Sequence, residues 1–477
     1  MASTANKQKR QLESLCNQGT AKKMFGLHKV LEKRALDNTP ISVSLVGVGT
    51  MGTVFAQSLS MTTGIDLCII CDLRTEEAIK VFESTGAPSS KIEVCKSVDE
   101  ANAAIKCGKK VVTSDISVAT SAEQVEAVCE STGVPAVYAQ TGISAIQNRK
   151  HFITMNVEGD VCVGHLMNNW AKQAGVVYSG IYGDEPGSAM LQHDEAKLIG
   201  LDVIAVGRTD MGGSNLCWNK ESIKPEMERL GICYNNTAIF ASFCDGSKTN
   251  EECCAIANAT GLPPDIRGMH GPKFNDWNEI ATRSPGVFRT KEEGGILGMR
   301  GVTDYIANDI IKAEPWHPFF IWTFAVVKAR TQGQTEWIVR EGGIVEGEYG
   351  LLYGPYHRGS AQAPVTVAVA VVDKRPVIAP LEGSKRTADC ITLAKKDLSA
   401  GEVIDEIGGF CTVGRIEKAS ITRAGRLLPF ALAKGTVVKR DIPMGTWLTY
   451  DDVEFAGEPS LLLNLRRVQD AMFGDLW

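Results

Sequence analysis

A lysine and an acid stand close together at the expected start of a helix. Asp245 and Lys248 bracket a Gly-Ser pair, ahead of a run with helical character that ends near Thr260. A lysine held in a cleft can move the proton of a hydroxyl group while hydride leaves the same carbon, provided that burial lowers its pKa. In the alternative interpretation Asp245 only caps the helix and Lys248 is solvated. The sequence leaves both interpretations open.

A second polar group follows the apolar run at 151–155, which is expected to be a strand. Asn156, Glu158 and Asp160 come directly after it. Ligands of a doubly wound sheet lie beyond the carboxyl ends of its strands. We therefore expect Asn156 to contact a cofactor and Glu158 to act as an acid–base group or a metal ligand. Asp160 is expected to cap the next helix.

Two further acids, Asp184 and Glu185, stand before Pro186, a residue that suits the first turn of a helix. Acids at this position stabilise a helix through its dipole without any catalysis. With Glu158 they could also hold magnesium or manganese, because hard divalent cations prefer carboxylate oxygens. Spacing alone does not fix the ligands, so the metal requirement and its ligand set are unknown at this point.

Arg208 and Arg358 are the candidates for binding a substrate phosphate or carboxylate. A guanidinium group can bind two oxygens of such an anion at once, although each arginine could equally form an ordinary ion pair. His270, Tyr356 and His357 lie in loops that contain glycine and proline, and they are further candidates for substrate contact. A single histidine is more often a packing residue.

These residues need a scaffold, and the clearest part of it surrounds a glycine motif near the N-terminus. The residues over 41–47 are apolar and β-branched, as a buried parallel strand should be. A helical segment over 53–61 and a second strand over 65–71 follow. In this βαβ setting the glycines predict a dinucleotide site, because they permit a tight turn, approach to a pyrophosphate and close helix packing. The predicted cofactor contacts in this turn are Gly47, Gly49, Thr50, Met51 and Gly52.

The second strand ends at Asp72, where a carboxylate could accept hydrogen bonds from the ribose hydroxyl groups of NAD. Arg74, two residues further on, could instead pair with the 2′-phosphate of NADP. The two residues favour different cofactors, so the choice between NAD and NADP stays open.

The pattern along the chain predicts an α/β fold with three domains. Strands are expected at 109–113, 151–155 and 176–178, and helices at 121–131 and 163–174. The apolar run over 365–372 could be a strand or a buried helix. We predict a helical segment over 1–37, with its helix over 16–36, a doubly wound Rossmann domain over 38–180, an α+β central domain over 181–386 and a small β-rich domain over 387–477.

Composition excludes several classes of protein. A formal net charge of -6 gives no reason to expect nucleic acid or an acidic membrane as a partner. The longest apolar runs are far shorter than the ~20 residues of a membrane span. The 14 cysteines lack a second pair to complete a zinc site with Cys68 and Cys71, so we expect free thiols in the reducing cytoplasm. Neither a hydrolase nucleophile elbow nor a Walker phosphate loop is found.

Several motifs along the chain form one ordered set. They are Gly47–Gly52, Met155–Asp160, Gly183–Gly187, Ser242–Lys248, Ala257–Gly261, Gly354–His357, Lys396–Glu402, Ile407–Gly409 and Lys439–Gly445. This order resembles the homoserine-dehydrogenase-like NAD(P)-dependent oxidoreductases with a C-terminal SAF domain. One branch of that family is the 1-deoxy-D-xylulose 5-phosphate reductoisomerase-like enzymes. The resemblance extends over nearly the whole chain.

The resemblance implies a Rossmann domain, a central catalytic and oligomerising domain, and a C-terminal SAF domain. It implies hydride transfer with a nicotinamide cofactor, and a substrate or acid–base role for Asp184 or Glu185. In the reductoisomerase-like branch a phosphorylated keto-sugar is rearranged and then reduced, which would place the chain in isoprenoid biosynthesis.

Three hypotheses about function are compatible with the sequence. The first is an oxidoreductase of a small phosphorylated keto-sugar or polyol, which requires converging Arg or Lys for the phosphate. The second is a homoserine-type dehydrogenase of a hydroxy acid or hydroxy-amino acid, which requires an acid for the ammonium group. The third is a nucleotide sensor without catalysis. In each case we expect a homodimer, paired through the central domain.

Overall fold

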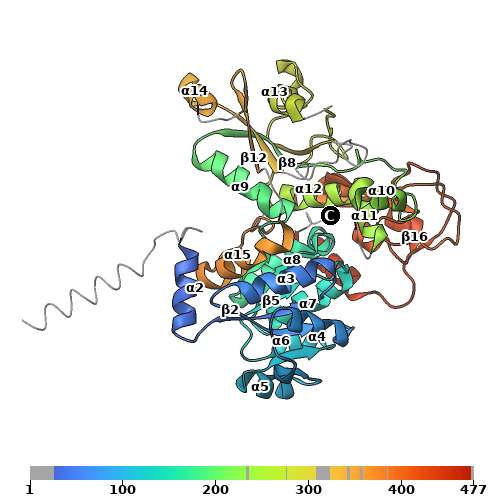
Figure 1. The fold of residues 1–477 in the computed structure, drawn as a ribbon. Coiled ribbons are helices and arrows are strands. Elements are labelled where there is room, and N and C mark those ends of the chain that lie inside the picture. Colours follow the sequence, from blue (N-terminus) through green and yellow to red (C-terminus); the bar gives the residue numbers. More distant parts are fainter. Residues whose placement is uncertain are drawn as a thin grey trace, which may run out of the picture.

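The computed structural model describes residues 26–232, 236–274, 277–307, 323–340, 344–354, 358–383 and 385–473. Figure 1 shows the N-terminal part as a lower unit, the middle of the chain as an upper unit, and the C-terminal part at their side. Helix α12 (Ser247–Thr260) lies where these parts meet, because it packs on helices of both units and on a C-terminal strand. The predicted acid–base residue Lys248, in the first turn of α12, therefore lies at the junction of the three parts.

The first sheet has seven parallel strands in the order β3-β4-β2-β1-β5-β6-β7. Its central strands are apolar and almost entirely buried, as expected for a sheet that helices cover on both faces. The fold class is therefore confirmed as α/β with a Rossmann-like sheet. The strands are β1 (Ile41–Val46), β2 (Ile65–Cys71), β3 (Ile92–Val94), β4 (Lys110–Thr113), β5 (Ala127–Glu130), β6 (His151–Thr154) and β7 (Tyr178–Gly180).

Helices connect these strands, and the helix predicted over 121–131 is wrong. That segment instead ends helix α6 and contains β5, which pairs with β1 and β6 in the middle of the sheet. Four residues, of which three are apolar, are too few to show a period, so pairing with the neighbouring strands decided the outcome. The helices are α2 (Leu27–Leu36), α3 (Thr50–Met61), α4 (Thr75–Ser84), α5 (Val98–Lys106), α6 (Ile116–Ser121), α7 (Pro135–Gln147) and α8 (Val157–Ala174).

Two predictions near the edges of the first domain can be followed in the structure. The helix expected over 16–36 appears as α2 from Leu27 onward, and residues 16–25 lie outside the described part. The apolar run over 365–372 is helical, in α15 (Ala363–Ala368) and the π-helical turn Val369–Asp373 that continues it. Their buried residues pack with those of β1, β2 and α3, so this late segment completes the core of the first sheet.

The middle of the chain forms a second, mixed sheet in the order β11-β12-β10-β8-β9. Strand β8 pairs parallel to β9 and antiparallel to β10. The strands are β8 (Asp202–Thr209), β9 (Val302–Ile306), β10 (Thr323–Lys328), β11 (Ile344–Glu346) and β12 (Tyr349–Gly354). The helices are α9 (Glu185–Leu198), α10 (Lys224–Leu230), α11 (Thr237–Cys244), α12, α13 (Trp277–Val287) and α14 (Gln332–Arg340).

The C-terminal part contains two small antiparallel sheets, β13–β14 and β15–β16. Helix α17 returns to the first unit and packs on α7 and α8, where the side chain of Gln469 bonds to the backbone of Cys162 and Leu166. The elements are β13 (Ala388–Ala394), β14 (Thr412–Lys418), α16 (Ala419–Ala424), β15 (Val437–Val438), β16 (Val453–Glu454) and α17 (Leu461–Phe473).

The cysteine pair with zinc-type spacing is buried in strand β2. Burial raises the pKa of the Cys68 and Cys71 thiols to about 12, so neither favours the thiolate that zinc requires. In the described ranges we find no helix with the length and apolar character that a bilayer crossing would need.

Candidate active site

The glycine turn has the geometry that a dinucleotide needs. Gly47 has a φ of +92°, which favours glycine, and its amide bonds to the carbonyl of Cys71 at 2.8 Å. A Cβ on Gly52 would lie 2.2 Å from the carbonyl oxygen of Gly47, so α3 can approach β1 only without a side chain there. A Cβ on Gly49 would meet nothing within 4 Å. The open space at Gly49 faces the start of α3, where free amides and the helix dipole favour a phosphate.

Asp72 lies at the carboxyl end of β2, as predicted, and its carboxylate joins two neighbouring backbone segments. Its two oxygens accept hydrogen bonds from the amides of Val48 and Arg74, both at 2.9 Å. Asp72 therefore fixes the glycine turn, and its predicted contact with a ribose stays a prediction. The Arg74 side chain is 66% exposed, and its Nε lies 3.7 Å from Asp72. A group that can hold a 2′-phosphate thus stands beside one that can hold ribose hydroxyls.

Glu130, which the sequence analysis missed, lies at the end of β5 beside this turn. The fully buried carboxylate accepts hydrogen bonds from the Thr132 amide and the Thr154 hydroxyl, both at 2.8 Å, and from Asn156 Nδ2 at 3.4 Å. Burial outweighs these contacts and raises the pKa of Glu130. The residue escaped notice because β5 was taken for a helix, and only a strand would have placed its last residue at the ligand edge.

Asn156 caps helix α8, and its place between β6 and α8 is the one that the sequence predicted. Its Oδ1 accepts a hydrogen bond from the amide of Gly159 at 2.9 Å. The prediction that Asp160 caps this helix is wrong, because Asp160 lies inside the first turn and binds the hydroxyl of Tyr178. Burial raises the pKa of Asp160 to about 6.

Lys248 and Glu158 form an ion pair between the start of α12 and the first turn of α8. The distance from Lys248 Nζ to Glu158 Oε1 is 2.7 Å, and the two side chains are 12% and 11% exposed. The expected lowering of the lysine pKa is wrong. Burial does act to lower it, but the charges of Glu158, Glu251 and Asp184 outweigh burial and raise the pKa of Lys248 above its ordinary value. The ammonium form is therefore the stable one.

Glu251 stands one turn after Lys248 on α12 and was also missed. Within the described ranges, neither of its carboxylate oxygens has a hydrogen-bond partner, although the side chain is fully buried. Burial and the charge of Glu158 raise the pKa of Glu251 well above its ordinary value. We therefore expect the Glu251 carboxyl group, next to the Lys248–Glu158 ion pair, to be protonated.

The sequence left open whether Asp245 acts in proton transfer or caps helix α12, and the N-cap alternative is wrong, because Gly246 holds that position. Oδ1 of Asp245 accepts a hydrogen bond from the Ser247 amide at 2.8 Å. Its Oδ2 accepts one from Nζ of Lys395 at 2.6 Å, and both side chains are buried. Lys395 directly follows β13, so the C-terminal part of the chain contributes a charge to the base of the site.

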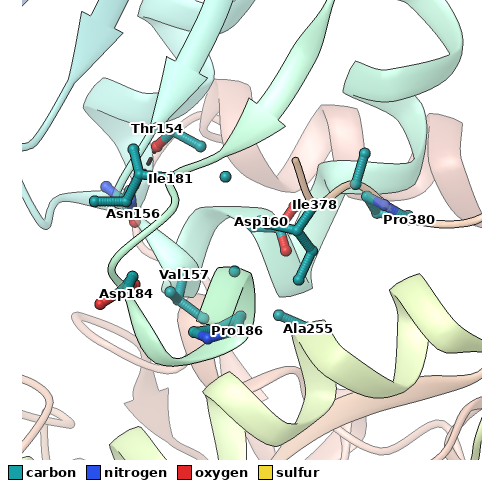
Figure 2. Close-up of a pocket in the computed structure, with 13 residues that line it drawn as sticks. Thr154, Asn156, Val157, Asp160, Ile181, Asp184, Pro186, Ala255, Ile378 and Pro380 are labelled. Atoms are coloured by element: carbon teal, nitrogen blue, oxygen red, sulfur yellow. Dashed lines mark hydrogen bonds between the residues drawn. The ribbon is translucent and has the colours of Figure 1, made fainter. Parts of the chain in front are cut away.

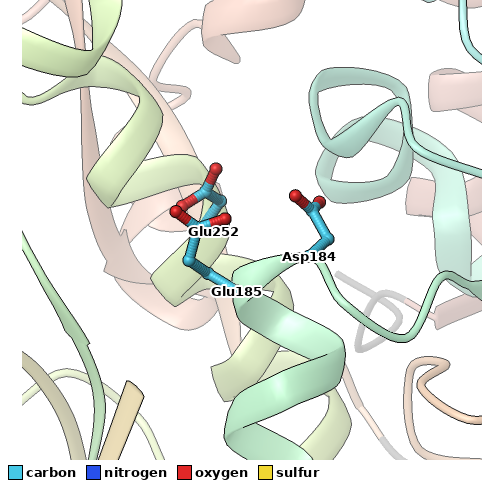
Figure 3. Close-up of side chains that lie close together, drawn as sticks. All are labelled: Asp184, Glu185 and Glu252. Carbon is cyan, nitrogen blue, oxygen red and sulfur yellow. The ribbon is translucent and has the colours of Figure 1, made fainter. Parts of the chain in front are cut away.

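Asp184 and Glu185 begin α9 and meet an acid from α12 that the sequence did not single out (Figure 3). Each of Asp184, Glu185 and Glu252 has a carboxylate oxygen within 4.8 Å of one from the others. Burial, followed by the charge of Glu185, raises the pKa of Asp184 to about 8. The acid that joins Asp184 and Glu185 is therefore Glu252, whereas Glu158, which the sequence analysis placed in this group, pairs with Lys248.

Arg208 lies inside this acidic group rather than at its opening. Its fully buried guanidinium places Nη2 3.1 Å from Glu185 Oε1 and pairs through Nη1 with Glu252. This corrects the expectation that Arg208 holds a substrate anion, since the guanidinium serves as counter-ion of the two glutamates. A metal ion at these carboxylates would have to compete with it.

A small cavity with Asp160 and Asp184 in its lining lies at the carboxyl edge of the first sheet (Figure 2). Its lining includes Thr154, Asn156, Asp160 and Asp184 at the carboxyl edge of the first sheet, and Ala255 of α12. The volume of about 20 Å³ is enough for about one water molecule. Polar residues of both units thus face a common space.

The remaining candidates are placed in different ways. Arg358 is exposed and precedes a 3₁₀ turn in which the Gly359 amide bonds to the carbonyl of Gly183 at 2.8 Å, so its loop adjoins Asp184. His270 belongs to another group, where Nε2 lies 2.7 Å from Oδ2 of Asp265. Tyr356 and His357 lie outside the described residues.

Residues 183–360 match the family model described as the catalytic domain of oxidoreductase DRL. The matched stretch contains both acids of α9, Arg208 and the whole of α12. The chain is an oxidoreductase. Its parallel sheet with the glycine turn makes it one of the NAD(P)-dependent kind, as the sequence predicted. The match ends before residue 387, so the SAF domain stays a prediction.

Solved structures of similar fold include several dehydrogenases. Three similar solved structures are a homoserine dehydrogenase from Thiobacillus denitrificans, a probable dehydrogenase from Thermotoga maritima, and scyllo-inositol dehydrogenase from Lactobacillus casei with bound cofactor NAD(H) and scyllo-inositol. Their identities are 15%, 14% and 14%, and their TM-scores 0.40, 0.38 and 0.38. They cover 86%, 70% and 70% of this chain and 97%, 90% and 88% of their own. We draw neither cofactor nor substrate from values this low. A search of curated protein sequences gives no match.

Proposed function

We propose that the chain uses NADPH or NADH to reduce the carbonyl group of a small phosphorylated keto-sugar to a hydroxyl group, and catalyses the reverse oxidation of the polyol. The observation that carries the proposal is the ion pair between Lys248 and Glu158, with a distance of 2.7 Å, beyond the carboxyl end of β6. A buried ammonium group at the ligand edge of a nucleotide-binding sheet is suited to protonate an oxygen next to a hydride acceptor.

The cofactor would bind with its pyrophosphate at the glycine turn. Gly49 leaves room for it, and the start of α3 supplies amides. Asp72 and Arg74 would contact the adenosine ribose or its 2′-phosphate. When bound, the nicotinamide supplies or accepts the hydride.

Lys248 would act as the acid in the direction of reduction. Its raised pKa keeps Lys248 protonated at neutral pH, and an alkoxide that forms as hydride arrives is basic enough to take this proton. Glu158 holds the ammonium group in place. Asp184, whose pKa of about 8 lets it exchange a proton near neutral pH, would return the proton to Lys248 after turnover.

The substrate would lie with its hydroxyl groups toward the acids and its phosphate toward the rim. Carboxylate oxygens of Asp184 and Glu158 are suitable acceptors for sugar hydroxyls. Arg358 is exposed on the loop that bonds to Gly183, so its guanidinium can reach a phosphate from the outside. 1-Deoxy-D-xylulose 5-phosphate is the first substrate to test, with rearrangement before reduction as in the enzymes that the sequence resembles.

One observation favours a second candidate, a homoserine-type dehydrogenase. The acids Asp184, Glu185 and Glu252 lie within reach of one ammonium group, which a hydroxy-amino acid would carry. The same acids could bind magnesium or manganese, with Glu252 in the place that the sequence analysis gave to Glu158. Chelation by EDTA separates these ideas, because only a metal-dependent reaction would lose its rate.

The deciding experiment is oxidation of NADPH and NADH by the full chain, with 1-deoxy-D-xylulose 5-phosphate, the same sugar without phosphate, and aspartate semialdehyde. Turnover that requires the phosphate supports the proposal. Turnover only with aspartate semialdehyde would replace it by the second candidate. Cofactor binding without turnover of any of the three would contradict both substrate assignments.

We also propose that the mixed sheet of the middle unit joins two chains. Its edge strand β11 pairs, among the described residues, with β12 alone, which leaves the other edge of β11 for a second chain. A sedimentation measurement that gives a monomer at micromolar concentration would contradict this arrangement.

A further inference from the structure

The C-terminal part contains a cavity that the proposed reaction does not use. It lies between helices α16 and α17 and the small sheet β15–β16, and its volume is about 620 Å³. This falls within the range of roughly 300–1,000 Å³ that is usual for small-molecule sites. The lining contains none of the acid–base residues described above.

The lining is strongly basic. It contains six cationic side chains and two acidic ones, Glu454 and Asp470. Residues from four separate stretches of the sequence supply the positive charge. The cationic residues are Arg386, Arg423, Arg426, Lys439, Arg466 and Arg467.

Two of the arginines are buried and form the floor of the cavity. Arg386 bonds to Asp389 and Asp470, both at 2.6 Å, and Arg466 bonds to the same acids at 2.8 and 3.0 Å. The two guanidinium groups therefore share two carboxylates. Burial and the charge of Arg466 lower the pKa of Arg386, as expected where positive charges are crowded. Arg386 Nε is buried and has no hydrogen-bond partner within the described part of the chain.

The other cations lie nearer to solvent. Arg426 pairs with Asp451 at 3.3 Å, and both side chains are largely exposed, so that ion pair is weak. Lys439, which directly follows β15, and Arg467 of α17 are both exposed. A ligand can therefore displace water from these groups at little cost.

Two aromatic rings complete the lining. Tyr450 and Phe455 lie with their ring centroids 6.2 Å apart. They add apolar surface to the charged lining, a combination that suits an anion with an organic part.

We propose that this cavity binds a small polyanion with two or more phosphate groups. Several converging cations bind a diphosphate far better than a single phosphate, because each phosphate group can contact a separate guanidinium or ammonium group. Inorganic pyrophosphate and a nucleoside diphosphate share this chemistry, and the aromatic rings distinguish them by favouring the nucleoside.

Isothermal titration of the full chain with pyrophosphate and with ADP tests the proposal. Saturating NADH is present throughout, so that the glycine turn is not available to either probe. We expect both probes to bind with micromolar Kd, and the Kd to rise with ionic strength. Absence of heat with both probes at millimolar concentration would overturn the proposal. Tighter binding of ADP than of pyrophosphate assigns the nucleoside form, and equal binding assigns the diphosphate alone.

The variant Lys439→Gln with Arg467→Gln should raise both Kd values at least tenfold. Both residues are exposed, so the fold should persist, and circular dichroism checks this. Lys434→Gln is the matched control, since Lys434 is an exposed lysine of the same region outside the cavity lining. A double variant that binds as well as the control would overturn the proposal.

Discussion

Lys248 Nζ and Glu158 Oε1 lie 2.7 Å apart although 90 positions separate the two residues. One stands at the start of α12 and the other in the first turn of α8, so the pair joins the middle unit to the nucleotide-binding sheet. The geometry of this pair depends on both units being folded and docked. The proposed acid–base chemistry would therefore depend on the junction of the two units.

Replacement of Lys248 by alanine should abolish most of the activity without preventing folding. Loss of a general acid costs about 100-fold or more in kcat, while cofactor binding at the glycine turn should be unchanged. Steady-state kinetics and NADH titration measure the two effects. Lys224→Ala is the control, because Lys224 is an exposed lysine paired with Glu221. A Lys248→Ala variant with the kcat of the control would remove Lys248 from the mechanism.

Replacement of Lys395 by alanine should destabilise the protein. The variant leaves the carboxylate of Asp245 buried without its cation, which costs about 3–5 kcal/mol in the free energy of unfolding. The neighbouring Lys396 forms an exposed ion pair with Glu402, so Lys396→Ala should cost at most about 1 kcal/mol. Urea unfolding of the two variants makes the comparison. Equal losses would show that the buried pair does not stabilise the fold.

Asp184 should make the stability depend on pH. Its pKa is raised from 3.8 to about 8 in the folded protein. A raised pKa stabilises the fold fully below the ordinary value, and this contribution is lost as the pH rises through the folded value. The Tm of the wild type should therefore fall between about pH 4 and pH 8 by more than that of Asp184→Asn. Asp194→Asn, an exposed position on the same helix, is the control and should follow the wild type.

Two glycine substitutions should separate folding from cofactor binding. A Cβ at position 52 would lie 2.2 Å from the carbonyl oxygen of Gly47, so Gly52→Ala should lower both Tm and NADH affinity. A Cβ at position 49 meets no protein atom within 4 Å, so the Gly49→Ala variant should have the Tm of the wild type. It should nevertheless bind NADH at least about tenfold more weakly, because it enters the space for the pyrophosphate. Wild-type affinity in Gly49→Ala would place the cofactor elsewhere.

The βαβ unit around Gly47 and Asp72 was predictable because its signals are local. A buried strand, a tight turn and a helix each have a pattern within a few residues, and the motif orders them. Strand β5 was misassigned because four residues have no measurable period, and with it Glu130 was lost. Glu251 and Glu252 were not recognised either, since an acid inside a helix is ordinarily a solvated residue.

The class of fold, the glycine turn and the residue types available for proton transfer could be predicted from the sequence alone. These features depend on interactions between near neighbours, which composition and spacing record. The partners of each side chain, by contrast, follow from how distant segments pack. This packing joined Lys248 to Glu158, gave Asp245 a cation from beyond β13, and turned Arg208 toward two glutamates. Burial and charge at these contacts set the protonation states, and both are properties of the packed protein rather than of the chain.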